Sequence, residues 1–127
     1  MSNITLGKTF SRDMVVTPKD TSIAHGSGNL EILATPALVA LMENTALKCL
    51  DGALDEGQET VGTVINVKHV KATPVGKKIT CRATISRVDG RRVSFLIEAW
   101  DDTAPVGTAE HDRVIIDREK FTRKIEA

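Results

Sequence analysis

The sequence predicts an α+β protein in which one antiparallel β-sheet wraps around a single long central helix. Two observations predict this fold. Residues 35–50 carry apolar side chains at helical spacing and form the only long helical pattern in the chain. From Thr60 onward, apolar and polar residues alternate as they do in half-buried strands, and tight turns separate the runs. A sheet must bury one face and this helix is its only long partner, so residues 1–127 are expected to form one domain.

The central helix is expected to run from Pro36 to Leu50. Thr35 before a proline is typical of a helix start, because its hydroxyl can cap a free amide and the φ angle of proline suits the first turn. Asp51-Gly52 provides the end. Glu43 stands out, since the residues three or four positions away are all apolar, namely Val39, Ala40, Ala46 and Leu47. An unpaired buried carboxylate is costly, so Glu43 must be paired, have a raised pKa or face a cavity.

Four or five strands are expected around this helix, at residues 10–16, 60–72, 77–88, 91–100 and 106–116. Asp89-Gly90 predicts a type I′ hairpin, in which both central residues need a positive φ angle. In the run 60–72 the odd positions share one face, so His69 extends an apolar face and Gly62 lies on the opposite one. Residues 119–127 are interpreted as a charged tail.

The composition argues against several classes of function. The net charge is zero, with 17 basic and 17 acidic residues, and aromatic residues make up 3% of the chain, so a nucleic acid would find neither a basic surface nor a stacking platform. The longest apolar run, residues 37–42, is far shorter than the roughly 20 residues of a membrane helix. Cys49 and Cys81 are typical of small core residues in a reducing compartment. A cytoplasmic protein without a nucleic-acid or membrane partner is therefore expected.

Glu43 and His69 are the first candidates for chemistry, because the helix face and the sheet face that pack together carry them. A histidine can take or give a proton near pH 7, and a carboxylate can orient it, position water or attack a carbonyl. Thr35 lies two turns before Glu43 at the helix N-terminus, where the amides of Ala37 and Leu38 would favour a developing oxyanion. These are the parts of an acyl-transfer site.

Each candidate also has a purely structural interpretation. Thr35 can be a plain N-cap, Glu43 can be half of an ion pair with an arginine, and His69 can be a hydrogen-bonded strand residue. His111 is interpreted as a surface residue, because it lies between Glu110 and Asp112. A metal site is not expected, since no second ligand stands at a metal-ligand spacing near the candidate histidine.

A set of short motifs, taken in order, resembles the hotdog-fold thioesterases, and within them the fluoroacetyl-CoA thioesterase branch. The motifs are residues 34–43, Val61-Gly62-Thr63, Val67-Lys68-His69, residues 72–76, residues 89–92 and His111-Asp112-Arg113. The resemblance extends from about Gly7 to Phe121. It implies the hotdog fold, in which the sheet wraps the helix, and a homodimer with its sites near the subunit interface. A pair of such dimers is a further possibility, and exposed sheet edges independently favour at least a dimer.

The resemblance also implies an activity, which is the hydrolysis of an acyl-CoA thioester by Thr35, Glu43 and His69 without a metal or an organic cofactor. Gly62 and Arg113 match residues of the substrate site, and the helix start at Pro36-Ala37 is expected to contact the substrate. Residues 26–30 contain no aromatic residue, whereas the fluoroacetyl specialist carries phenylalanines there, so a general short or medium acyl group is expected. The alternative is a non-catalytic hotdog module that binds acyl-CoA or a hydrophobic ligand.

Overall fold

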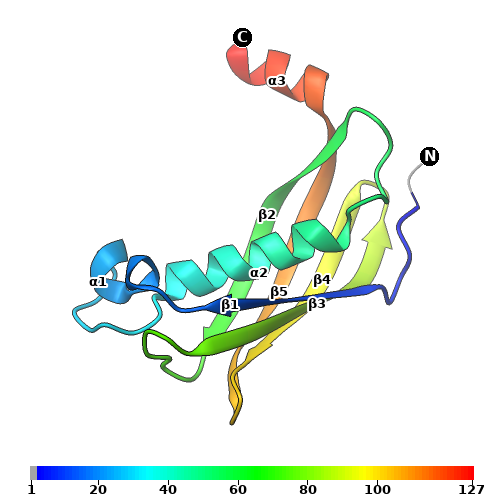
Figure 1. Cartoon of the computed structure of the whole chain (residues 1–127). Coiled ribbons are helices and arrows are strands. Elements are labelled where there is room, and N and C mark those ends of the chain that lie inside the picture. The colour runs from blue at the N-terminus through cyan, green and yellow to red at the C-terminus, as the bar shows by residue number, and fades with distance from the viewer. Residues whose placement is uncertain (1–2) are drawn as a thin grey trace.

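A computed structural model describes residues 3–127 and confirms the sheet around a central helix (Figure 1). The five strands are all antiparallel and lie in the order β1-β3-β4-β5-β2. Their bounds are Thr9–Val15 for β1, Gln58–His69 for β2, Lys78–Asp89 for β3, Arg92–Trp100 for β4 and Pro105–Asp117 for β5. The helices are the 3₁₀ turn Pro18–Asp20, α1 at Ser22–His25, α2 at Thr35–Cys49 and α3 at Arg118–Glu126.

The core lies between one face of the sheet and α2. The helix contributes a buried stripe, and the sheet contributes the alternate residues of its three central strands. The helix residues are Ala37, Leu38, Leu41, Met42, Thr45, Ala46 and Cys49; large sheet residues opposite them are Ile79, Ile85, Phe95, Ile97 and Ile115. The start of α2 lies at the end of the edge strand β2, and its last residue lies beside the chain just before the edge strand β1, so each helix end is close to an edge of the sheet.

Thr35 is not the N-cap of α2, so that interpretation of the sequence is wrong. The cap is Ala34, which has extended φ and ψ angles, and its carbonyl oxygen accepts hydrogen bonds from the amides of both Ala37 and Leu38 at 3.0 Å. Thr35 is the first helical residue, and its hydroxyl is therefore turned away from the capping position. These two bonds already use the Ala37 and Leu38 amides, so the expectation that both amides are free to bind an oxyanion is wrong.

A β-bulge in β2 changes which residues face the helix. Gly62 pairs with Arg113 and Val64 pairs with Asp112, so Thr63 is an extra residue on the β2 side of the ladder. One extra residue reverses the alternation, and Gly62 therefore shares the inward face with Ile65 and His69. The expectation that Gly62 lies opposite His69 is wrong for this reason.

Two further local predictions are corrected. Asp89 pairs with Arg92, so the hairpin loop is Gly90-Arg91, and within residues 3–127 only glycines have positive φ angles. With glycine first and φ at 60°, the loop has the type II′ pattern rather than type I′. The expected charged tail forms helix α3, whose first turn is capped by Asp117 through a bond from the Lys120 amide at 3.0 Å.

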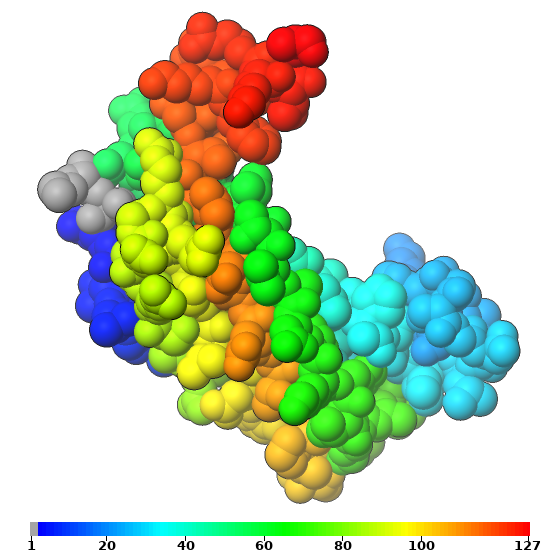
Figure 2. All heavy atoms as spheres, turned by 180° about the vertical axis from the view of Figure 1, so that it is seen from behind, coloured from blue at the N-terminus to red at the C-terminus, as the bar shows by residue number. Residues whose placement is uncertain are grey.

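The outer edge of β2 is open. Strand β2 pairs with β5 along one side only, and β1 is the strand at the opposite edge of the sheet. Figure 2 shows β2 (green) bordering a recess, with α3 beyond one end of the strand and α1 beyond the other. A long strand with unpaired backbone groups and an open recess beside it is a template for a further strand.

Candidate active site

Thr35 and His69 meet at one end of the molecule. The Thr35 hydroxyl lies 2.8 Å from Nδ1 of the His69 ring. The last residue of β2 reaches the first residue of α2 because the segment before the helix is fastened to the loop after the strand. There, the Leu33 amide donates to the Thr73 carbonyl at 2.8 Å, and Ile32 forms a β-bridge with Pro74. The structure thus brings together two of the three predicted catalytic residues.

The environment of His69 favours the neutral ring. Burial lowers the pKa of its imidazole, and the polar backbone of nearby Lys71 opposes this shift without cancelling it. Its second nitrogen, Nε2, is buried and has no hydrogen-bond partner within residues 3–127. A neutral imidazole with one nitrogen on a hydroxyl and the other uncommitted can both accept and deliver a proton.

A second polar cluster lies halfway along α2, where Glu43 faces β2 and β5. A Cβ atom added to Gly62 would stand 2.9 Å from Oε2 of Glu43, 3.2 Å from Cε1 of His111 and 3.5 Å from Nη1 of Arg113. The missing side chain of Gly62 therefore leaves the space into which the Glu43 carboxylate reaches. We name these four residues the Glu43 cluster.

Arg113 is held rigidly in the Glu43 cluster although it is almost fully buried. Its Nε donates to the Thr60 hydroxyl at 2.9 Å and its Nη2 donates to the Thr60 carbonyl at 3.1 Å. Its Nη1 donates to Nε2 of His111 at 3.2 Å. Burial lowers the pKa of the guanidinium, and the attraction of Glu43 opposes that shift. Arg113 therefore presents a fixed positive charge to the space above Gly62.

His111 is buried, at 1% exposure, so its interpretation as a surface residue is wrong. It occupies an inward position of β5, as Ala109, Arg113 and Ile115 do, and that alternation was the available signal. Its Nδ1 donates to the Val64 carbonyl at 2.7 Å, which leaves Nε2 as the acceptor for Arg113. Burial is the main cause that lowers the pKa of His111, and Arg113 acts in the same direction.

Glu43 does not meet His69 within one chain. It lies eight residues after Thr35, about 12 Å along the helix axis, and Gly62 lies seven residues before His69, about 23 Å along the strand. Within residues 3–127 its carboxylate makes no hydrogen bond and no contact ion pair; its interaction with Arg113 is a longer-range attraction. The contact ion pair considered for Glu43 is therefore absent from the described chain. At the helix start, Pro36 is exposed and Ala37 is buried.

Replacing Gly62 with alanine is expected to lower turnover by about 100-fold, because a shift of roughly 1 Å at a reacting group can cost that much. The added methyl would stand 2.9 Å from the Glu43 carboxylate, which must then move. Glu110→Ala, at an exposed position on the outer face of β5, is the control. Comparing the kcat of both variants tests this role. Equal activities would show that the space above Gly62 is not used.

Two histidines with a lowered pKa predict how stability depends on pH. His69 and His111 both have a lowered pKa in the folded state, so the unfolded chain, with a histidine pKa of about 6.5, binds protons more readily. Their contribution to folding is present above about pH 6.5 and is lost as the pH falls through the folded-state values. Urea unfolding at several pH values between about 5 and 7.5 should show this loss, and His69→Ala should reduce it. The exposed His25→Ala variant should not. A free energy of unfolding that rises on acidification would contradict the assignment.

Residues 3–127 contain neither a cluster of metal ligands nor a membrane-spanning helix. No group of three histidine, cysteine, aspartate or glutamate side chains is placed to hold a metal ion. No helix among these residues has both the length and the apolar character needed to cross a membrane.

Comparisons with known proteins agree on one family. Residues 16–119 match the family model for the fluoroacetyl-CoA-specific thioesterase FlK. A fluoroacetyl-CoA thioesterase from Streptantibioticus cattleyicolor is 34% identical over 127 residues, which cover 94% of this chain and 91% of the relative. A solved structure of the fluoroacetyl-CoA thioesterase FlK superimposes with a TM-score of 0.91 at 32% identity, over 98% of this chain and 96% of that one.

A protein of the thioesterase superfamily from Thermus thermophilus has a TM-score of 0.90 at 25% identity, over 99% of this chain and 93% of its own. The same sheet order and helix therefore extend beyond the fluoroacetyl-CoA thioesterases themselves, and the hotdog fold inferred from the motifs is confirmed. The chain belongs to the fluoroacetyl-CoA-specific thioesterase family of hotdog-fold enzymes, which are thioester hydrolases.

Proposed function

We propose that this protein hydrolyses acyl-CoA thioesters with a small or medium acyl group, and that it needs no metal and no organic cofactor. The observation that carries the proposal is the bond of 2.8 Å between the Thr35 hydroxyl and a half-buried His69, whose pKa is lowered by burial and whose Nε2 has no hydrogen-bond partner within residues 3–127. Solved structures of FlK variants include complexes with acetyl-CoA and with fluoroacetate and CoA. These complexes support acyl-CoA as the substrate class here.

The proposed active enzyme is a homodimer, because one chain holds the predicted catalytic residues in two separate places. Antiparallel pairing of β2 with the β2 of a second copy would use the open edge and the recess beside it (Figure 2). A two-fold axis near the middle of residues 62–69 would place Gly62 of each copy opposite His69 of the other. The Glu43 cluster of one protomer would then face Thr35 and His69 of its partner.

In the proposed reaction, the residues of this joint site divide the work. His69 acts first as a general base and then as an acid that protonates the departing thiolate of CoA. The Thr35 hydroxyl, at the positive end of α2, holds the thioester carbonyl as negative charge develops on its oxygen. The attacking oxygen comes from a water molecule that Glu43 orients and His69 deprotonates, or from the Glu43 carboxylate itself. In the second case the C–S bond breaks and leaves a mixed anhydride on Glu43; a water molecule then hydrolyses the anhydride, and His69 passes the proton of that water to the CoA thiolate.

The substrate contacts are proposed from the same geometry. Gly62 leaves room for the acyl group beside Glu43, and Arg113 offers a fixed positive charge to a polar acyl substituent or to the carbonyl. Pro36-Ala37 would border the thioester at the helix start. Residues 26–31 are exposed and contain no aromatic side chain, so nothing there selects for fluoroacetyl over other small acyl groups. We propose a cytoplasmic location, where acyl-CoA esters and a reducing environment coincide.

The test is a thiol-release assay over a panel of acyl-CoA esters, from acetyl and fluoroacetyl through hexanoyl to an aromatic acyl group. Both cysteines of the protein are buried, and burial raises the pKa of Cys81 to about 11, so a thiol reagent will report CoA with little background. Turnover of at least one ester supports the proposal. Saturable binding of the esters without thiol release would instead identify a non-catalytic binding module.

A further inference from the structure

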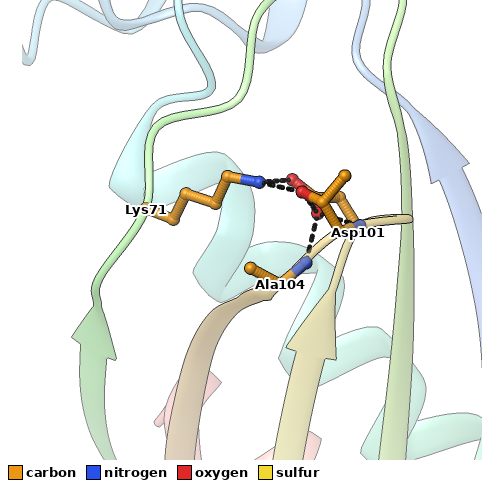
Figure 3. A network of polar contacts seen from close by, with 4 residues as sticks. Lys71, Asp101 and Ala104 are labelled. Atoms are coloured by element: carbon orange, nitrogen blue, oxygen red, sulfur yellow. Dashed lines mark hydrogen bonds and ion pairs between the residues drawn. The ribbon is translucent and has the colours of Figure 1, made fainter.

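An ion pair between Lys71 and Asp101 joins the loop after β2 to the turn between β4 and β5. Nζ of Lys71 lies 2.5 Å from Oδ2 of Asp101 and donates to the Thr103 hydroxyl at 2.7 Å (Figure 3). We call Lys71 and Asp101 the latch. Only 7% of the Asp101 side chain is exposed. The ion pairs Lys78–Asp13, Arg82–Glu98 and Arg87–Asp89 elsewhere on the sheet all join more exposed partners.

Asp101 is itself fixed by its own turn. Its Oδ1 accepts hydrogen bonds from the Thr103 amide at 2.8 Å, the Thr103 hydroxyl at 2.9 Å and the Ala104 amide at 2.9 Å, and its own amide donates to the Ala104 carbonyl at 3.0 Å. The bond from Lys71 and those from the turn hold the pKa of Asp101 well below its usual range. The carboxylate therefore stays charged and immobile over the whole pH range in which a histidine titrates.

The segment that the latch anchors carries both members of the Thr35–His69 pair. Lys71 is two residues after His69, and between them the Val70 amide donates to the Val106 carbonyl at 2.8 Å. Two residues after Lys71, the Thr73 carbonyl accepts from the Leu33 amide at 2.8 Å. Leu33 in turn precedes Thr35 by two residues. A displacement of Lys71 would thus move the histidine and the start of α2 together.

We propose that Lys71 and Asp101 are positioning residues that hold the His69 ring against the Thr35 hydroxyl and keep it out of water. The latch touches neither the hydroxyl nor the ring and acts through the backbone of residues 69–73. This inference rests on the proposed function for its catalytic consequence. The placement of the His69 ring, which is the structural part of the proposal, can be tested without a substrate.

The test compares Lys71→Met with Asp101→Asn, which remove opposite charges from the same latch. Asparagine keeps an acceptor oxygen for the turn around Thr103, so the fold of that turn is retained. Lys71→Arg keeps the ion pair and is the conservative variant. Lys48→Met is the matched control, because Lys48 forms its ion pair with Asp51 at 3.9 Å between exposed side chains at the far end of α2 from Thr35.

The first readout is the titration of the His69 ring by NMR in the full chain without substrate. Loss of positioning lets water reach the ring, so both Lys71→Met and Asp101→Asn should raise the pKa of His69 toward its ordinary value of about 6.5. A pure charge effect would act differently, since loss of the lysine raises the pKa of His69 and loss of the aspartate lowers it. Shifts in opposite directions, or no shift in either variant, would overturn the proposal.

The second readout is the kinetics on whichever acyl-CoA ester the wild type hydrolyses. Both latch variants should lower kcat by roughly 10- to 100-fold with KM within about 2-fold, because misplaced groups lose rate rather than binding. Lys71→Arg and Lys48→Met should retain wild-type kcat. An unchanged kcat in a variant whose His69 pKa has moved would overturn the catalytic part of the proposal. If the wild type hydrolyses none of the esters, the proposed function fails, while the NMR titration still decides the positioning.

Discussion

Replacing Glu43 with glutamine is expected to lower kcat by at least about 100-fold, the lower end of the range for acid and base groups. Glutamine has nearly the same size as glutamate, so it fits the space above Gly62, but it cannot act as a nucleophile or a base. His69→Ala should cause a loss of the same size, because it removes the one ring that contacts the Thr35 hydroxyl. The measurement is initial-rate thiol release on the preferred ester.

Two control variants separate catalysis from general damage. Glu110→Gln alters an exposed carboxylate on the outer face of β5, and His25→Ala alters an exposed histidine at the end of α1. Both should retain wild-type kcat. Urea unfolding should show that Glu43→Gln and His69→Ala remain folded under assay conditions. Wild-type turnover in either of those two variants would remove that residue from the mechanism.

The architecture could be predicted because it follows from periodicity. Residues 35–50 repeat at helical spacing, and the runs after Thr60 alternate as strands, so the helix and the sheet each have one apolar face to bury. The strand boundaries differ from the predicted ones by three residues or fewer. Turn residues such as Gly90 marked the connections correctly even where the turn type differed.

The details of the site were harder to predict, because they depend on single residues whose effect is not periodic. Thr63 gives no sign in the sequence that it is the extra residue of a bulge, yet it decides that Gly62 faces Glu43. A threonine before proline is equally compatible with capping and with the first helical position. For Thr35 the second is decided by Ala34, whose extended backbone and carbonyl bonds make it the cap.

The predictions for His111 and for residues 119–127 were wrong for a different reason: they relied on the charge of neighbouring residues. The acidic neighbours of His111 suggested a surface position, although those neighbours point to the other face of β5. The charged stretch 119–127 lacks an apolar stripe wide enough to predict a buried helix, but a cap at Asp117 is sufficient to start an exposed one. In both cases the charge of neighbouring residues was taken to describe the whole stretch, although adjacent side chains on a strand or a helix point in different directions.

The pairing of Glu43 with His69 remains a prediction, and it concerns two chains rather than one. Glu43 and His69 both lie on the apolar side of their elements, as expected. The expectation that they meet considered only which faces pack together, and not how far along the helix and the strand each residue lies. With Thr35 and His69 at one end of α2 and Glu43 near its middle, a second copy of the chain is needed to bring the three together. The central claim is therefore that the active site is shared between protomers.

Co-expression of two differently tagged chains, one with Glu43→Gln and the other with His69→Ala, followed by purification on both tags, tests this claim most directly. Each homodimer should be inactive. In the mixed dimer one of the two sites combines an intact Glu43 with an intact His69 from the partner, so about half of the wild-type kcat per dimer is expected.

The reciprocal mixture pairs a wild-type chain with the double variant Glu43→Gln, His69→Ala. If the site is shared, neither site of this dimer is complete and it should show at most a few per cent of wild-type activity, because each site lacks one acid or base group. If each chain held a complete site, the results would be exchanged: the first mixture would be inactive and the second would keep about half of the activity. That exchanged result, or failure of the two tags to purify together, would contradict the shared site.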